Sequence, residues 1–207
     1  MNTGQLQTIE TFNASAARYE RSIAQLLNYN HTYDFLIDEL CDDQRVLDLA
    51  CGPANISRYL LKKKKLHITG IDLSDEMLSI ARKNIPDGTF LKQSILDFDI
   101  SGKADLVLNG FGLPYLNMDQ AGCCLRRMYA SLHASGLAYV SFMHGSGSRL
   151  EKPSFCPDAE ILIFYHPKND IINQMKTAGF EIEKEWELDY AESDGSITKD
   201  IILIGRK

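Results

Sequence analysis

The sequence of 207 residues contains no long hydrophobic run, and none of its segments approaches the roughly 18 apolar residues that a membrane-spanning helix needs. The residues from Met1 to Thr11 are largely polar, so we expect no secretory signal. Positive charge is also scarce, because 22 Lys and Arg stand against 28 Asp and Glu, a net charge of -6. A groove that follows a phosphate backbone needs a basic surface, so we expect neither a membrane nor a nucleic acid as partner.

Cysteine is present but not in a ligating pattern. The five cysteines are an odd number and include no C-x-x-C pair, which is the usual spacing of a zinc site. Nothing else in the sequence indicates an oxidising compartment. We therefore expect a reduced, cytoplasmic protein that holds no metal.

What the sequence does contain is an alternation of helical and strand-like segments. Helical periodicity is expected over 5–27, 33–41, 55–65, from Ser74 onward, and over 119–132 and 168–178. Strands are expected over 46–50, 66–73, 89–92, 104–109, 136–143, 180–189 and 198–204, with an Asp194-Gly195 turn before the last and an irregular stretch over 145–160. This order predicts an α/β fold, with helices on both faces of a mostly parallel sheet and an antiparallel pair at its end.

Two loops at predicted strand ends carry the chemical signal. The apolar run through Asp48 enters a turn of small residues at Gly52, where a ligand can approach the backbone. Asp72 ends the next predicted strand, where a carboxylate can accept hydrogen bonds from a ribose diol. Gly52 alone could be a turn residue, and Asp72 alone a neighbour of a helix cap. Together, in this order, they indicate a nucleoside-containing ligand at the carboxyl ends of the strands.

With these motifs the sequence resembles the class I S-adenosylmethionine-dependent methyltransferases of the small-molecule type. Residues 111–116 and the Tyr165-His166 pair also look like segments of that family. The resemblance implies a Rossmann-like fold with a seven-stranded, mostly parallel sheet and an antiparallel C-terminal hairpin strand. It also implies one methyltransferase domain over 1–207. Within it, the N-terminal helices in 1–42 help to cover the acceptor site, 43–207 form the core, and 144–166 form a lid.

The resemblance implies S-adenosylmethionine as cofactor and a role for individual residues. Asp48 would orient the methionine amino group through water, while the backbone of Ala50, Cys51 and Gly52 passes beside the cofactor. Asp72 would bind the ribose hydroxyls. The other implied cofactor contacts are Leu73, Met77, Ser94, Ile95, Asn109 and Phe111.

The sequence departs from the family pattern in two places. The usual G-x-G-x-G loop is Ala50-Cys51-Gly52-Pro53-Ala54, so only the middle glycine is kept. Ala54 would crowd the turn if that position needs a positive φ. Ser94 stands where an acidic residue is common, so we expect the contact to the adenine amino group to be weakened or replaced.

On the acceptor side we consider His144, His166 and Tyr115 as catalytic candidates, and Tyr19, Tyr115 and Tyr165 as walls of the substrate pocket. A hydroxyl acceptor would gain from a general base, whereas an amine or thiolate acceptor needs none. For each histidine the alternative is a structural role, either as a hydrogen-bonding loop residue or at the start of a helix.

We expect a small-molecule acceptor, because residues 109–112 do not match the N-P-P-[YF] pattern of enzymes that methylate nucleic-acid bases or protein amides. One alternative is a non-catalytic protein that binds the cofactor as a sensor or partner, suggested by the altered glycine loop. A dinucleotide-dependent oxidoreductase is disfavoured by the absence of G-x-G-x-x-G. The sequence leaves open the acceptor, the atom that is methylated and the oligomeric state.

Overall fold

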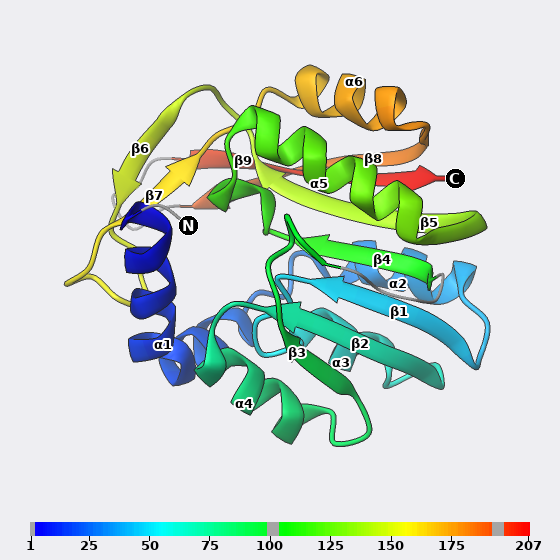
Figure 1. Ribbon diagram of the computed structural model, residues 1–207, viewed down its shortest axis with the longest axis horizontal. Coiled ribbons are helices and arrows are strands. Elements are labelled where there is room, and N and C mark those ends of the chain that lie inside the picture. Colours follow the sequence, from blue (N-terminus) through cyan, green and yellow to red (C-terminus); the bar gives the residue numbers. More distant parts are fainter. Residues whose placement is uncertain (1–2, 99–103, 192–196) are drawn as a thin grey trace.

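The computed structural model describes residues 3–98, 104–191 and 197–207 and contains a seven-stranded sheet in the order β3-β2-β1-β4-β5-β9-β8 (Figure 1). The neighbouring pairs among the first five strands in this order are parallel, and β9 runs antiparallel to both β5 and β8. The strands are β1 (Gln44–Leu49), β2 (Leu66–Asp72), β3 (Thr89–Lys92), β4 (Ala104–Gly110), β5 (Leu132–Met143), β8 (Glu181–Ala191) and β9 (Ile197–Arg206). The predicted fold class is confirmed.

The central strands are apolar along their whole length because helices cover both faces of the sheet. Successive side chains of a strand point to opposite faces; thus Val46 packs in the cluster with α2 (Asn30–Glu39), α3 (Asn55–Leu60) and α4 (Asp75–Asn84). Leu47 packs on the other face, in the cluster with α5 (Met118–Ser131) and α6 (Lys168–Ala178). The edge strand β8 instead alternates between half-buried apolar and exposed acidic residues, as the sequence predicts.

The helix boundaries follow local capping chemistry. The Ser74 side chain accepts a hydrogen bond from the Met77 N–H and starts α4, and Gly179, at φ 113, ends α6; both signals were predicted. The helix expected over 55–65 is shorter than predicted, because α3 ends at Leu60 and the lysines after it form turns. The strand expected from residue 136 begins earlier, at Leu132. The expected Asp194-Gly195 turn lies outside the described residues.

The segment expected to be irregular over 145–160 contains part of a second sheet. Strand β6 (Ser148–Glu151) pairs antiparallel with β7 (Ile161–Phe164). The expectation of irregular structure is wrong for 148–151, because this hairpin is stabilised by side chains that are distant in sequence. Arg149, for example, lies 4.3 Å from the ring centroid of Tyr165.

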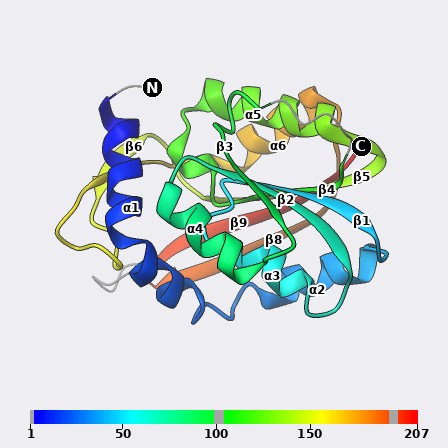
Figure 2. The ribbon, with the colours of Figure 1, turned by 60° about the horizontal axis from the view of Figure 1, so that its bottom comes forward.

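Helix α1 (Thr3–Ile23) lies next to this hairpin, beyond the carboxyl ends of the parallel strands (Figure 1). A second view shows the same helix alongside α4 (Figure 2). The Asn13 side chain on α1 accepts a hydrogen bond at 2.6 Å from the Ser74 hydroxyl at the start of α4. Among the described helices, none is both long and apolar enough to cross a membrane.

Candidate functional site

A cavity lies at the carboxyl ends of β1 to β4, under α1 and β7. The loops after these four strands form its floor, as expected for a ligand site in a parallel sheet. Its walls come from α1, from the 3-10 turn η1 (Leu113–Tyr115) and from β7. The predicted site residues that line it are Ala50, Gly52, Asp72, Leu73, Met77, Ser94, Ile95, Phe111, Tyr19 and Tyr115.

The loop after β1 turns by placing every second residue in the left-handed region. Ala50, Gly52 and Ala54 have φ values of 52, 53 and 60. These are the three glycine positions of the G-x-G-x-G pattern. Position 54 therefore does adopt the positive φ at which an alanine was expected to crowd the turn. An L-residue in this conformation costs about 1–2 kcal/mol relative to the right-handed region, and the chain accepts that cost at two alanines.

Asp72 ties this loop to the end of β2. Its Oδ2 accepts a hydrogen bond from the Gly52 N–H at 2.9 Å, and its Oδ1 accepts one from the Ser74 N–H at 2.8 Å. Burial raises the pKa of Asp72, and these backbone N–H groups partly offset that rise. Each carboxylate oxygen has two lone pairs, so acceptor capacity remains for hydroxyl groups of a ligand.

Asp48 is buried behind the loop and is not among the residues that line the cavity. The Ser57 hydroxyl donates a hydrogen bond to its Oδ2 at 2.6 Å. The pKa of Asp48 is raised to about 7, mainly by burial and also by the negative charge of Asp72, while the hydrogen bond from Ser57 lowers it. A cationic group near this carboxylate would be attracted to it and would lower its pKa.

The loop after β3 supplies a residue that the sequence patterns did not single out. Gln93 follows β3 directly and lines the cavity, and its buried Oε1 has no hydrogen-bond partner among the described residues. The neighbouring Ser94 uses its hydroxyl on the Leu96 N–H at 3.2 Å. A polar residue at the carboxyl end of a parallel strand was the available signal for Gln93.

The loop after β4 is held by hydrogen bonds from within the core. Asn109 is fully buried behind the lining; its Oδ1 accepts from the Gly112 N–H at 2.9 Å and its amide contacts the Cys124 sulfur at 3.5 Å. Phe111 reaches the lining at φ 58, with its N–H donated to the Ser141 hydroxyl. Cys51 is likewise buried and outside the lining.

Four aromatic rings gather where α1 meets η1 and the hairpin. Phe12 makes edge contacts with Tyr19 and Tyr115, each at 5.5 Å between ring centroids, and stacks on Phe155 at 5.4 Å. Tyr19 meets Phe155 edge-on at 5.0 Å. We call Phe12, Tyr19, Tyr115 and Phe155 the ring cluster. Phe12 and Phe155 were not predicted, because the chain brings them together from positions far apart in the sequence.

The two histidine candidates lie outside the lining. His144 Nδ1 accepts a hydrogen bond from the Lys168 N–H at 3.2 Å, at the first residue of α6. His166 is 1% exposed, and its Nε2 lies 3.1 Å from the Leu113 carbonyl oxygen. Burial lowers the pKa of His166. Both positions match the structural alternative considered for these residues.

Of the remaining acceptor-side candidates, Tyr165 also lies outside the lining, where its hydroxyl bonds Glu151. Tyr115 and Tyr19 do line the cavity. Burial raises the pKa of Tyr19 to about 12 and that of Tyr115 well above its usual value, with the charge of Asp72 contributing to both. Both phenols therefore stay neutral near pH 7, and Tyr115 is suited to hydrogen bonding and packing.

The segment that matches known proteins in sequence includes the loops after β1 to β4, which form the floor of this cavity. A model of the methyltransferase domain family matches residues 46–136, the segment from β1 to β5. Trans-aconitate 2-methyltransferase of Enterobacter sp. (strain 638) is 35% identical over 81 residues, 39% of this chain and 31% of that protein. Demethylmenaquinone methyltransferase of Thermotoga maritima is 50% identical over 50 residues, 23% of this chain and 21% of that protein. The match thus spans a third or less of either relative.

Solved structures share the fold over nearly the whole chain. The 1,6-didemethyltoxoflavin-N1-methyltransferase of Burkholderia thailandensis, solved with 1,6-didemethyltoxoflavin and S-adenosylhomocysteine, has a TM-score of 0.74 and 17% identity, over 100% of this chain and 91% of that one. The magnesium protoporphyrin IX methyltransferase of Synechocystis, solved with its S-adenosylhomocysteine, also has a TM-score of 0.74, at 16% identity, over 98% and 99% of the two chains.

Proposed function

We propose that this chain, which belongs to the class I S-adenosylmethionine-dependent methyltransferases, transfers a methyl group from S-adenosylmethionine to a small-molecule acceptor. The observation that carries the proposal is the Asp72 carboxylate, held by the Gly52 and Ser74 N–H groups in the cavity floor. The same proposal treats residues 1–207 as one cytoplasmic methyltransferase domain.

The residues of the cavity fit this cofactor. Asp72 would accept the ribose hydroxyls, and Leu73, Met77 and Ile95 offer an apolar slot for the adenine ring. The unpartnered Gln93 Oε1 can accept a hydrogen bond from the adenine amino group. That contact would replace the acidic side chain whose place Ser94 takes.

At the other end, the methionine part would lie against the loop from Ala50 to Gly52 and the segment from Gly110 to Gly112. Asp48 lies behind that loop and would act on the amino group through water. When bound, S-adenosylmethionine supplies an activated methyl group. That methyl carbon would pass to a lone pair of the acceptor as the carbon–sulfur bond breaks and its electron pair stays on sulfur.

The protein itself would position the reacting groups and exclude water from them. Holding nucleophile, methyl carbon and sulfur in line can be worth about 7–11 kcal/mol. We assign this to the walls formed by Phe12 and Tyr115, closed from outside by Phe155. The N-terminal helices and the 144–166 segment then act together as the cover of the acceptor site.

No general base is part of this proposal. Tyr115 is the one catalytic candidate that lines the cavity, and its raised pKa keeps it protonated near pH 7. We therefore give it a positioning role. A proton that the acceptor loses would pass to water, as an amine or thiolate acceptor permits.

The proposal is tested by titrating the protein with S-adenosylmethionine and S-adenosylhomocysteine by calorimetry. Binding of both at micromolar concentration is expected, and weaker binding in a Gln93→Ala variant. Absence of binding at millimolar concentration would overturn the proposal. Binding of NADH instead would support the oxidoreductase alternative, and cofactor binding without turnover on amines, phenols and thiols would support the non-catalytic one.

A further inference from the structure

We propose that the acceptor is a flat aromatic molecule without negative charge, and that Phe12, Tyr19 and Tyr115 hold it. This inference rests on the proposed function and names the class of substrate for the same site. It follows from the aromatic rings that form the acceptor side of the cavity and from the absence of positively charged side chains among the described residues that line it.

The ring cluster leaves aromatic surface facing the cavity. Phe12, Tyr19 and Tyr115 all line it, and Phe155 covers Phe12 and Tyr19 from outside. The edge-on geometry of Phe12 against both tyrosines fixes the rings in different planes, each at about a right angle to Phe12. A flat aromatic molecule can make stacked or edge-on contacts in such a site, worth about 0.5–1.5 kcal/mol beyond burial of its area.

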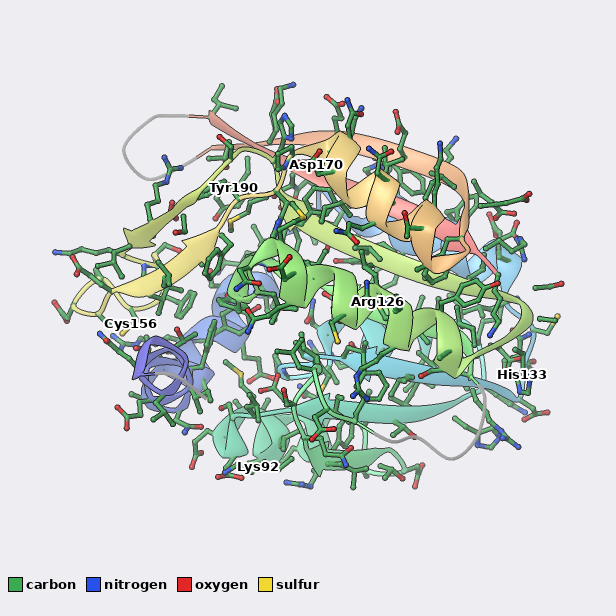
Figure 3. The ribbon with its side chains drawn as sticks, turned by 45° about the horizontal axis from the view of Figure 1, so that its top comes forward. Lys92, Arg126, His133, Cys156, Asp170 and Tyr190 are labelled. Atoms are coloured by element: carbon green, nitrogen blue, oxygen red, sulfur yellow. The ribbon has the colours of Figure 1, made fainter. Side chains whose placement is uncertain are left out.

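The contacts behind the ring cluster keep it in place. The Arg18 guanidinium on α1 lies 3.7 Å from the Cys156 sulfur, next to Phe155. Figure 3 shows Cys156 on the hairpin loop beside α1. The Asn13 contact with Ser74 holds the same helix on its other side. The rings are thus positioned by the tertiary structure before an acceptor arrives.

Positive charge does not reach the cavity. Among the described residues that line it, Asp72 is the sole acidic residue, and there is no Lys, Arg or His. The nearby Arg149 is engaged by Glu151 and by the face of the Tyr165 ring. A carboxylate or phosphate on the acceptor would lose its water without a counterion among the side chains of the protein, which is strongly unfavourable.

The hydroxyl groups of Tyr19 and Tyr115 also influence which acceptor the cavity can bind. Both remain neutral, and Asp72 lies close enough to raise the pKa of each. The charge of Asp72 therefore makes the potential at these two tyrosines more negative, which disfavours an anion and tolerates a neutral or cationic molecule. The hydroxyls can donate to, or accept from, an acceptor nitrogen, oxygen or sulfur.

The experiment uses the full chain saturated with S-adenosylhomocysteine and two probes of matched shape, 2-naphthol and 2-naphthoate. Their dissociation constants are measured by calorimetry. We expect 2-naphthol to bind at least about tenfold more tightly, because only 2-naphthoate brings an uncompensated charge into the site. Phe12→Ala should weaken 2-naphthol binding about fivefold or more through lost ring contacts. Phe35→Ala, a half-buried ring against Trp186, should not change it.

A variant that adds a positive charge to the cavity tests the inference without removing an aromatic ring from the site. Thr8 lines the cavity from α1, so Thr8→Lys places a cation beside the rings. We expect it to tighten 2-naphthoate binding about tenfold, since a close ion pair compensates the buried charge. Ala17→Lys, at an exposed position of the same helix outside the lining, is the control and should leave the preference unchanged.

The outcomes separate the two proposals. If S-adenosylhomocysteine binds but 2-naphthoate binds as tightly as 2-naphthol, the acceptor class is wrong and the methyltransferase function stands. The same holds if the cofactor product binds and neither probe binds at millimolar concentration. If S-adenosylhomocysteine itself does not bind, the proposed function fails and this inference fails with it.

Discussion

The side chain of Asp72 accepts a hydrogen bond from the backbone N–H of Gly52 at 2.9 Å, across two neighbouring parallel strands. This bond joins the loop after β1 to the end of β2. It sets the spacing between the loop proposed to contact the methionine and the carboxylate proposed to bind the ribose. The first prediction addresses this pair directly.

Asp72→Asn should lower the affinity for S-adenosylhomocysteine by about 10- to 100-fold, because hydrogen bonds to a charged group are worth about 1.5–3 kcal/mol. An amide also offers one oxygen where two N–H donors need an acceptor, so the contact to Gly52 or Ser74 is lost. Calorimetric titration measures the change. Asp75→Asn, an exposed carboxylate paired with Lys92, is the control and should bind as the unmodified chain does.

Asp48 should make the stability of the protein depend on pH near neutrality. Its pKa is about 7 in the fold against an ordinary 3.8, so folding favours the protonated acid. The stability from that proton is fully present below about pH 4 and is lost as the pH rises through about 7. Asp48→Asn removes this dependence and can still accept the Ser57 hydrogen bond.

Urea unfolding of both proteins between pH 4 and pH 8 checks the Asp48 prediction. The variant should gain free energy of unfolding relative to the unmodified chain as the pH rises, by a few kcal/mol, since one pKa unit corresponds to about 1.4 kcal/mol. Other titrating groups cancel in the difference. A difference that is constant with pH would show that Asp48 is ionised in the folded protein throughout.

Ala50→Gly should stabilise the protein. Ala50 has a φ of 52 and is only half-buried, so glycine relieves left-handed strain with little loss of packing. Relief of about 1–2 kcal/mol, less the greater freedom of glycine in the unfolded chain, gives a gain of about 0.5–1 kcal/mol. Thermal or urea unfolding measures it.

The matched substitution for Ala50 is Ala17→Gly, at an exposed helical position of α1. There glycine should destabilise the protein by about 1 kcal/mol, because the backbone is right-handed and helical. Opposite signs for the two variants are expected. Two losses of similar size would show that residue 50 is not strained.

His144→Ala should affect stability and not cofactor binding. The lost hydrogen bond to the Lys168 N–H leaves the start of α6 less well capped, at a cost of about 0.5–1.5 kcal/mol. The dissociation constant of S-adenosylhomocysteine should stay within about twofold, and His144→Asn should recover part of the stability, because its amide oxygen can accept the Lys168 N–H in place of Nδ1. A large fall in turnover with unchanged stability would instead place His144 in the reaction.

The sequence by itself determined the order along the chain of the strands that form the seven-stranded sheet, and the floor of the cavity. Apolar runs that end in Gly52 and Asp72 are local patterns, and a parallel sheet brings the carboxyl ends of its strands to one edge. That is why local patterns alone predict Gly52 and Asp72 as site residues, whereas Leu73, Ser94 and Phe111 were implied by the resemblance to a family. The helix start at Ser74 and the helix end at Gly179 were likewise predicted from the sequence, because helix caps depend on a few neighbouring residues.

Only the tertiary structure decided the acceptor side. Phe12 and Phe155 are separated by most of the chain and carry no shared pattern, yet they stack at 5.4 Å. Which side chains at the strand ends reach the cavity also depends on packing, so Asp48 and Asn109 were found behind the lining and Gln93 within it. The two histidines lie beside helix α6 and η1 for the same reason. Periodicity fixes an element and its buried face, but the contacts between distant elements fix which side chains share a cavity.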